Sequence, residues 1–196
     1  MRIYERVAST VIGTPLQWPA EQLRALAALP RRLKHPELRE IYRESRLLPR
    51  VVERVVEPDM NCIDVGAHLG SVLARIVRAA PRGHHIAVEP VPYKADWLRR
   101  KFPTVDVREL ALGESDARAE FFLNSRRSGF SGLRQHGSGD TTRLEVACAR
   151  LDEIVPADRR VGFIKIDVEG GELGVFRGAQ QVLSRSRPTI LFECTR

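Results

Sequence analysis

The sequence predicts an α/β protein with a doubly wound, mostly parallel sheet, and three short segments carry that prediction. Residues 63–70, 86–90 and 163–172 read IDVGAHLG, IAVEP and FIKIDVEGGE. Each contains an apolar, strand-like run that ends in a carboxylate, and the first and third turn at once into glycine and a helical pattern. Because ligands of open α/β sheets bind at the carboxyl ends of the strands, these segments indicate a site for a nucleotide-type cofactor.

Strand and helix signals alternate from residue 61 onward. Strand-like runs cover 62–65, 85–89, 105–112, 161–167 and 189–193, and helical patterns cover 72–80, 93–102 and 173–183. This alternation implies parallel strands joined by right-handed crossovers. Two further strand-like runs, 119–124 and 143–149, enclose a Gly/Ser-rich loop at 125–139. We expect that loop to act as a mobile lid over the site.

The first part of the chain differs in character from the rest. We expect residues 1–58 to form an N-terminal helical cap and residues 59–196 to form the core. Leu23 and Leu26 keep helical spacing, which favours packing against the sheet. The alternative is a basic amphipathic helix that lies on a membrane surface or a lipid-like substrate, because Arg24 and other basic residues flank its apolar face.

Length, composition and charge restrict the class of protein to which this chain can belong. A chain of 196 residues with 43% hydrophobic and 29% charged residues suits one globular unit. The net charge of +7 is spread along the chain without a basic block, so we expect no nucleic-acid partner. Three distant cysteines, Cys62, Cys148 and Cys194, indicate neither a zinc cluster nor a disulfide framework. With no apolar stretch near the about 18 residues of a membrane span and no signal peptide, we expect a cytoplasmic protein.

The first segment differs from a dinucleotide-binding turn. A G-x-G-x-x-G turn needs its second glycine so that a pyrophosphate can lie against the backbone, and His68 takes that position between Gly66 and Gly70. A ligand with a carboxylate and an ammonium group fits better. The N–H groups that open the following helix attract a carboxylate, and Asp64 can accept a hydrogen bond from an ammonium. S-adenosylmethionine carries both groups, so we expect it as the cofactor.

A second acid supports the same cofactor. Glu89 ends the next strand, where acids accept hydrogen bonds from ribose hydroxyls. The alternative is that Asp64 and Glu89 only cap the helices that follow them, where the helix dipole favours carboxylates. Two acids at matching ends of consecutive strands favour the cofactor.

The third segment supplies the candidate reaction centre. Asp167 and Glu169 follow its strand, where one of them can remove a proton from an acceptor hydroxyl. Lys165 lies inside an apolar strand, where a charge is costly unless paired, and Asp167 faces the same side two positions on. We predict that this pair orients the acceptor or tunes the base; the alternative is a structural ion pair. Nothing in the sequence requires a metal ion, and we expect none.

These segments, together with the LALG sequence at 110–113, resemble the FkbM family of S-adenosylmethionine-dependent methyltransferases, which have a class I, Rossmann-like fold. The resemblance covers about residues 59–196, and 163–172 is its most specific part. The family usually has Asn at the position of His68. The resemblance implies a cofactor turn that includes Asp64, Gly66 and Gly70, a ribose contact from Glu89, and an adenine-side contact from Leu112.

The resemblance also implies a substrate class, because the family is associated with O-methylation of sugars, glycolipids and polyketide-type natural products. We therefore expect a small-molecule or glycolipid acceptor. Two alternatives stay open: an RNA or protein methyltransferase, and a truncated, non-catalytic relative. Class I cores ordinarily end in a further strand hairpin after the run that corresponds to 189–193, and this sequence stops at Arg196. We therefore expect an exposed sheet edge and a tendency to form homo-oligomers.

Overall fold

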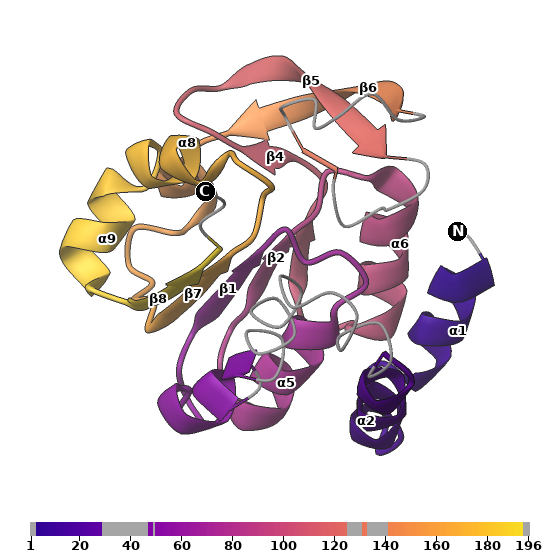
Figure 1. The fold of residues 1–196 in the computed structure, drawn as a ribbon. Helices are drawn as coiled ribbons and strands as arrows, with labels where there is room; N and C mark the ends of the chain where they lie inside the picture. The colour runs from indigo at the N-terminus through magenta and orange to yellow at the C-terminus, as the bar shows by residue number, and fades with distance from the viewer. Residues whose placement is uncertain (1–2, 29–46, 49, 125–130, 133–140, 194–196) are drawn as a thin grey trace.

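The computed structural model describes residues 3–28, 47–48, 50–124, 131–132 and 141–193. Within them, five parallel strands form the main sheet in the order β3-β2-β1-β7-β8 (Figure 1). The strands are β1 (Cys62–Val65), β2 (Ile86–Val88), β3 (Asp106–Arg108), β7 (Phe163–Ile166) and β8 (Thr189–Phe192). The order reverses between β1 and β7, which places the topological switch point of the sheet there. The predicted doubly wound α/β fold is confirmed.

Helices cover both faces of this sheet (Figure 1). One face carries α5 (Ser71–Ala79) and α6 (Pro92–Lys101), and the other carries α7 (Leu151–Ile154), α8 (Glu172–Arg177) and α9 (Gln180–Ser186). Alternate strand residues supply the two cores, because successive side chains of a strand point to opposite faces. Ile63 and Val65 pack toward α8 and α9, whereas Cys62 packs toward α5. Asp64 shares the face of Cys62.

The expected strand at 105–112 is wrong as a single element. The chain leaves the main sheet after β3 and forms β4 (Ala111–Leu112), which pairs with a different sheet of order β4-β6-β5. That second sheet is built on β5 (Ala117–Asn124) and β6 (Thr141–Ala149), which pair antiparallel. Ala111 and Leu112 are both buried. Ala111 packs with side chains of the second sheet, and Leu112 packs in the core on the α8 and α9 side of the main sheet, so this short run is covered on both sides.

The expected helix at 173–183 is two helices. The break between α8 and α9 falls at Gly178, where an added Cβ atom would collide with the backbone oxygen of Gly113. This close approach packs the break against the residue that follows β4. The helices α8 and α9, which cover one face of the main sheet, are therefore joined to the end of β4 by a backbone contact that only glycine permits.

The N-terminal helices α1 (Ile3–Val11) and α2 (Gln17–Ala27) lie beside α5 and α6 (Figure 1). Ile12, just after α1, is buried with Ala67 and Leu69. The Gln17 side chain of α2 donates a hydrogen bond to the backbone oxygen of Ser71, 3.1 Å away. The start of the chain is thereby held against the residues that follow β1. That residues 1–58 form one cap stays a prediction, because 29–46 lie outside the described residues.

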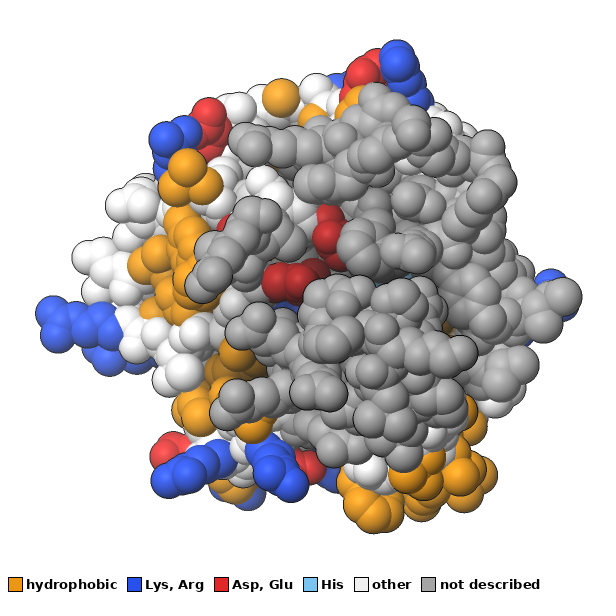
Figure 2. Space-filling model, in the orientation of Figure 1, with side chains coloured by type: hydrophobic (Ala, Val, Ile, Leu, Met, Phe, Trp, Pro, Cys, Tyr) orange, Lys and Arg blue, Asp and Glu red, His pale blue; other side chains and the backbone are white. Residues whose placement is uncertain are grey.

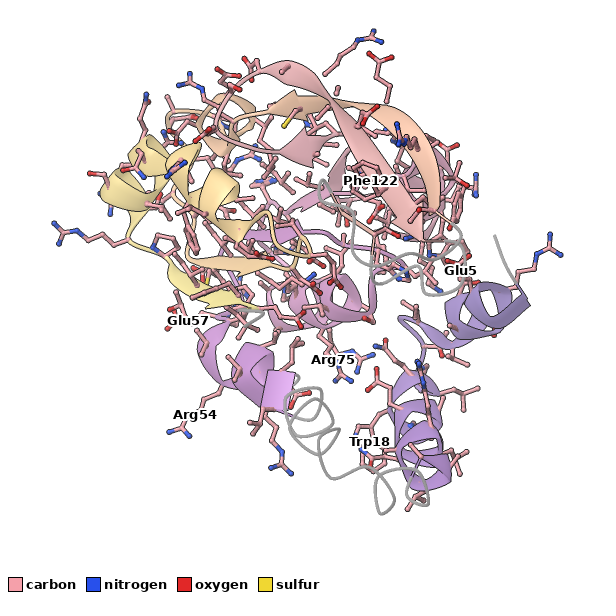
Figure 3. The ribbon with its side chains drawn as sticks, turned by 45° about the horizontal axis from the view of Figure 1, so that its top comes forward. Glu5, Trp18, Arg54, Glu57, Arg75 and Phe122 are labelled. Atoms are coloured by element: carbon pink, nitrogen blue, oxygen red, sulfur yellow. The ribbon has the colours of Figure 1, made fainter. Side chains whose placement is uncertain are left out.

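An ion-pair network also ties α2 to the core. Arg75 of α5 pairs with Glu21 of α2, and its guanidinium lies 3.6 Å from the Glu53 carboxylate in the helical residues 50–55 (Figure 3). On the outer side of α2, Leu23 and Leu26 are exposed. The expected packing of these two residues against the sheet is wrong: the polar Gln17 and Glu21 take the inner side, where they have hydrogen-bond and ion-pair partners. None of the helices in the described segments has the length and apolar character to cross a membrane.

Candidate cofactor and acceptor site

A cavity of about 280 Å³ opens at the carboxyl ends of β1, β2 and β7, which is near the lower end of the range for ligand sites, about 300–1,000 Å³. It lies at the switch point, where open α/β sheets bind ligands. Figure 2 shows acidic side chains near the middle of the face that corresponds to this end of the sheet. The predicted site residues that line it are Gly66, His68, Glu89, Leu112, Lys165, Asp167 and Glu169.

Gly66 and His68 build the turn after β1 with left-handed backbone conformations, φ 74° and 52°. A Cβ atom at Gly66 would collide with the backbone oxygen of Asp167. The glycine is therefore required by the close approach of the third segment, rather than by the cofactor alone. A left-handed conformation in a residue other than glycine is uncommon and costs energy, so His68 marks a strained turn at the cavity wall.

Glu89 is buried at the cavity wall and anchors the turn. Its Oε2 accepts a hydrogen bond from the backbone N–H of His68 at 2.8 Å, and its Oε1 accepts one from Val91 at 3.0 Å. Burial raises the pKa of Glu89 above its ordinary value, while Lys94 and the two N–H donors oppose that rise. Each carboxylate oxygen still has a lone pair for a ribose hydroxyl.

The N-terminus of α5 faces the same cavity. Gly70 precedes the helix with φ 84° and provides no side-chain cap. The N–H of Leu73 is directed at the buried Asp64 carboxylate, which leaves the N–H groups of Ser71 and Val72 for an anion. Ser71 and Val72 line the cavity, whereas Gly70 does not. An added Cβ at Gly70 would press on the side chains of Phe102 and Leu98, so this glycine lets α5 pack closely on α6.

Lys165 connects the first and third segments. Its Nζ lies 3.2 Å from Asp64 Oδ1 and 3.4 Å from Asp167 Oδ2. It also donates a hydrogen bond to the backbone oxygen of Gly66 at 2.8 Å. Burial alone would lower the pKa of Lys165, but the two carboxylates raise it above the ordinary value, so the ammonium stays charged. The predicted pairing of Lys165 with Asp167 is confirmed.

Asp64 lies behind Lys165 and does not line the cavity. It is buried, and burial raises its pKa, while Lys165 opposes that rise. The structure thus places Asp64 where it holds the lysine. Its predicted contact with the cofactor ammonium stays a prediction.

Glu169 carries a strongly perturbed carboxyl group at the cavity. Burial raises its pKa to about 8, and the negative charges of Asp167, Glu193 and Glu172 contribute to the rise. Carboxylate oxygens of Asp167, Glu169 and Glu193 lie within 4.8 Å of one another. Such a cluster is compatible with a cation, but acidic groups alone do not define a metal site. A carboxyl group with a pKa near neutrality is suited to general base catalysis.

The backbone around Glu169 is held in a strained turn. Glu169 has φ 52°. The Glu172 side chain accepts hydrogen bonds from the N–H groups of Gly170 at 3.1 Å and of Val168 at 3.4 Å. Glu172 therefore stabilises the turn that presents Glu169.

A further part of the cavity wall comes from the second sheet and from the loop between β5 and β6. Leu112 and Phe121 supply apolar surface. Of the loop at 125–139, only Ser131 and Gly132 are described; Ser131 lines the cavity, and Gly132 lies against the backbone of Glu169. The rest of the expected lid lies outside the described residues.

One cavity residue is absent from the sequence predictions. Lys94 lines the cavity and is 2% exposed. The sequence does contain an indication of this residue. Lys94 lies in the first turn of α6, just after Pro92, where the helix dipole disfavours a cation. A lysine in that position calls for acidic partners elsewhere in the fold.

The fold and the cavity together define a class: an α/β protein with a small-molecule site at its switch point, a buried carboxylate at the end of β2, and a turn after β1 that lacks the dinucleotide-binding glycine pattern. Residues 64–196 match the family model described as the methyltransferase FkbM domain. The chain belongs to this family, as the resemblance indicated.

Individual relatives are distant. The protein named Methyltransferase 1 from Beauveria bassiana (strain ARSEF 2860) is 27% identical over 145 residues, which cover 61% of this chain and 58% of that protein. The chain thus spans less than two thirds of this relative. Among solved structures, a precorrin-6y C5,15-methyltransferase from Geobacter metallireducens GS-15 has 19% identity and a TM-score of 0.41, covering 74% of this chain and 59% of its own. The sugar N-methyltransferase KedS8 from Streptoalloteichus sp ATCC 53650 has 12% identity and a TM-score of 0.42, covering 78% and 47%.

Proposed function

We propose that this chain transfers a methyl group from S-adenosylmethionine to a hydroxyl group of a sugar, glycolipid or related natural product. The observation that carries this proposal is the arrangement of one cavity: Glu89 and the uncapped start of α5 on one side, and Glu169 with a pKa of about 8 on the other. Membership of the FkbM family supports the reaction class.

The residues around the cavity fit this cofactor. Glu89 offers two carboxylate oxygens to the ribose hydroxyls, and the first N–H groups of α5 offer donors to the methionine carboxylate. Leu112 and Phe121 provide an apolar wall for the adenine. When bound, S-adenosylmethionine supplies an electrophilic methyl group on its sulfonium.

The protein contributes alignment and a base. Alignment of reacting groups can supply about 7–11 kcal/mol of a barrier, and a positioned general base contributes about 10²–10⁴-fold in rate. Glu169, in its carboxylate form, is the group we assign to accept the proton of the acceptor hydroxyl. Lys165 holds Asp167 beside Glu169 and fixes the turn at Gly66, so it is a positioning residue for both halves of the site.

A nucleic-acid acceptor is less well supported. The carboxylates of Asp167 and Glu193 lie beside Glu169 at the cavity; they repel a phosphate backbone, whereas nucleic-acid affinity depends on basic contacts. Among the described residues, the Lys and Arg side chains in Figure 2 lie at the margin of this face. We therefore retain the expectation of a small-molecule or glycolipid acceptor.

We also propose that α2 contacts a membrane surface, which would bring a glycolipid acceptor to the protein. Its exposed apolar side chains, Leu16, Trp18, Leu23 and Leu26, support this proposal. Co-sedimentation with vesicles of anionic lipid tests it. Loss of co-sedimentation in Trp18→Ser/Leu23→Ser would support it, and equal co-sedimentation of variant and wild type would contradict it.

Isothermal titration with S-adenosylmethionine, followed by a screen of hydroxyl acceptors for methyl transfer, tests the proposed reaction. We expect saturable binding at one site and transfer to a sugar or glycolipid hydroxyl. Absence of binding would contradict the cofactor assignment, and transfer only to RNA or protein would contradict the acceptor class.

A further inference from the structure

The first helix delivers a buried carboxylate to the region of the cavity. Glu5 of α1 is 0% exposed, and the Tyr93 hydroxyl of α6 donates to it, with oxygen–oxygen distances of 3.1 and 3.4 Å. Figure 3 shows Glu5 on the side of α1 that faces the rest of the molecule. A buried carboxylate is costly unless it is paired. This contact therefore fixes α1 to the start of α6.

The residue after Tyr93 connects this contact to the cofactor site. Lys94 lines the cavity, and its ammonium interacts electrostatically with both Glu5 and Glu89. Burial lowers the pKa of Lys94, and these two carboxylates oppose the effect. Lys94 in turn opposes the burial that raises the pKa of Glu89. One buried cation of α6 thus interacts with two buried acids, one from α1 and one at the end of β2.

A second contact couples α1 to the same site. Ala8 of α1 and Ile12 pack with Ala67 and Leu69, which flank His68 in the turn after β1. The N–H of His68 donates to Glu89. Through Lys94 and through the turn at His68, α1 is therefore linked to Glu89 in two ways.

We propose that Lys94 is a positioning residue for Glu89 and that Glu5 holds Lys94, so that docking of α1 completes the cofactor site. The inference rests on the proposed function, in which Glu89 binds the ribose. Lys94 favours the ionised form of Glu89 and its orientation, and the charge of Glu5 favours the ammonium form of Lys94. Undocking of α1 would then lower the affinity for the cofactor although α1 supplies no ligand to it.

The first test measures the affinity for S-adenosylmethionine of the full chain by isothermal titration. We expect Lys94→Met to weaken binding about tenfold or more, Lys94→Arg to retain most of it, and Arg100→Met, an exposed cation on the same helix, to leave it unchanged. Glu5→Gln should weaken binding in the wild-type background and have little further effect with Lys94→Met, since coupled residues are not additive. Additive effects of the two variants would overturn the inference.

The second test needs no cofactor. The pKa of His68 is lowered to about 4, chiefly by burial and next by the charge of Lys94, whereas Glu5 raises it. An NMR titration should therefore show a higher pKa of His68 in Lys94→Met and a lower one in Glu5→Gln. Unchanged titration in both variants, with normal cofactor binding by the wild type, would overturn this inference alone. Absence of cofactor binding by the wild type would contradict the proposed function and with it the role of Glu89.

Discussion

Asp64 and Lys165 are register partners on the adjacent parallel strands β1 and β7, and their charged atoms lie 3.2 Å apart in the interior of the protein. The lysine also reaches Asp167 and the backbone of Gly66. One buried cation thus ties the cofactor turn to the proposed reaction centre.

Removal of that cation should destabilise the protein. Lys165→Met leaves the Asp64 carboxylate buried without its ion partner, and loss of one partner of a buried pair costs about 3–5 kcal/mol. Urea denaturation should show this loss in the free energy of unfolding. The double variant Lys165→Met/Asp64→Leu should recover part of it, because an apolar pair can replace a buried ion pair. A single variant as stable as the wild type would contradict the importance of the pair.

Gly66→Ala should lower the stability of the protein more than the addition of one methyl group usually does. The residue has φ 74°, and its new methyl group would collide with the backbone oxygen of Asp167. A left-handed conformation alone costs about 1–3 kcal/mol, and thermal unfolding should report at least that. Gly174→Ala is the matched control. This residue lies inside α8, and its Cβ would make only ordinary van der Waals contacts with Gly113 and Glu114, so we expect no loss of stability there. Equal melting temperatures for the two variants would refute the steric argument.

Glu89→Ala should weaken binding of S-adenosylmethionine by about 1.5–3 kcal/mol, the range for hydrogen bonds that involve a charged group. Isothermal titration measures it, with Glu57→Ala as an exposed control. Because Glu89 also accepts the N–H groups of His68 and Val91, circular dichroism should confirm that the variant is folded. Unchanged affinity in a folded Glu89→Ala would exclude Glu89 as the ribose ligand.

The pH dependence of methyl transfer should follow Glu169. Its pKa is raised to about 8, and the base is the deprotonated form, so the rate should rise as the pH increases through about 8 and then level off. Glu169→Gln should lose this dependence and reduce the rate by about 10²–10⁴-fold. A wild-type profile that stays flat between pH 6 and 10 would rule out Glu169 as the base.

The same carboxyl group affects stability with a defined sign. Its folded pKa lies above the ordinary value of 4.5, so the folded protein holds the proton more tightly. The resulting contribution to stability is fully present below pH about 4.5 and is lost as the pH rises through about 8. Denaturation of wild type and Glu169→Gln across this window should show a smaller decline for the variant. Equal declines in the stability of wild type and variant would mean that other groups control the pH dependence of stability.

The edge of the main sheet should promote association between copies. Within the described residues β8 pairs only with β7, and Phe192 near its end is exposed. Edge strands with apolar side chains pair with other chains, so light scattering should show self-association that increases with concentration. Phe192→Lys should reduce it, whereas Leu173→Lys, on exposed surface of α8, should not. A wild-type monomer at all concentrations would contradict this prediction.

Local patterns predicted the main sheet because its strands are short apolar runs with clear ends. The segment 62–65 forms a strand with the predicted bounds, and the carboxylates at the strand ends converge because parallel strands end at one edge. The prediction of a single strand at 105–112 is wrong because an apolar run does not indicate which sheet it joins. The pair of Lys165 with Asp167 was predictable from a spacing of two residues.

Partners far apart in the sequence were not predictable. Asp64 joins Lys165 only through strand register, and Glu5 approaches Lys94 only after α1 packs on the turn near Leu69. The pKa of Glu169 depends on Glu193, which the β7–β8 pairing brings close. Such groups become neighbours through topology, and no local pattern encodes them.

The switch of the chain from the main sheet to the second sheet has a consequence for engineering. Gly113 and Arg150 bracket the hairpin of β5 and β6, and Phe121 of that hairpin lines the cavity and packs with Val91. The proposed ribose and methionine contacts come from the main sheet and the start of α5, whereas Phe121 comes from the second sheet. Exchange of the hairpin between family members should therefore reshape the apolar wall of the cavity, including the side chain that we propose packs on the adenine, while Glu89 and the start of α5 are kept.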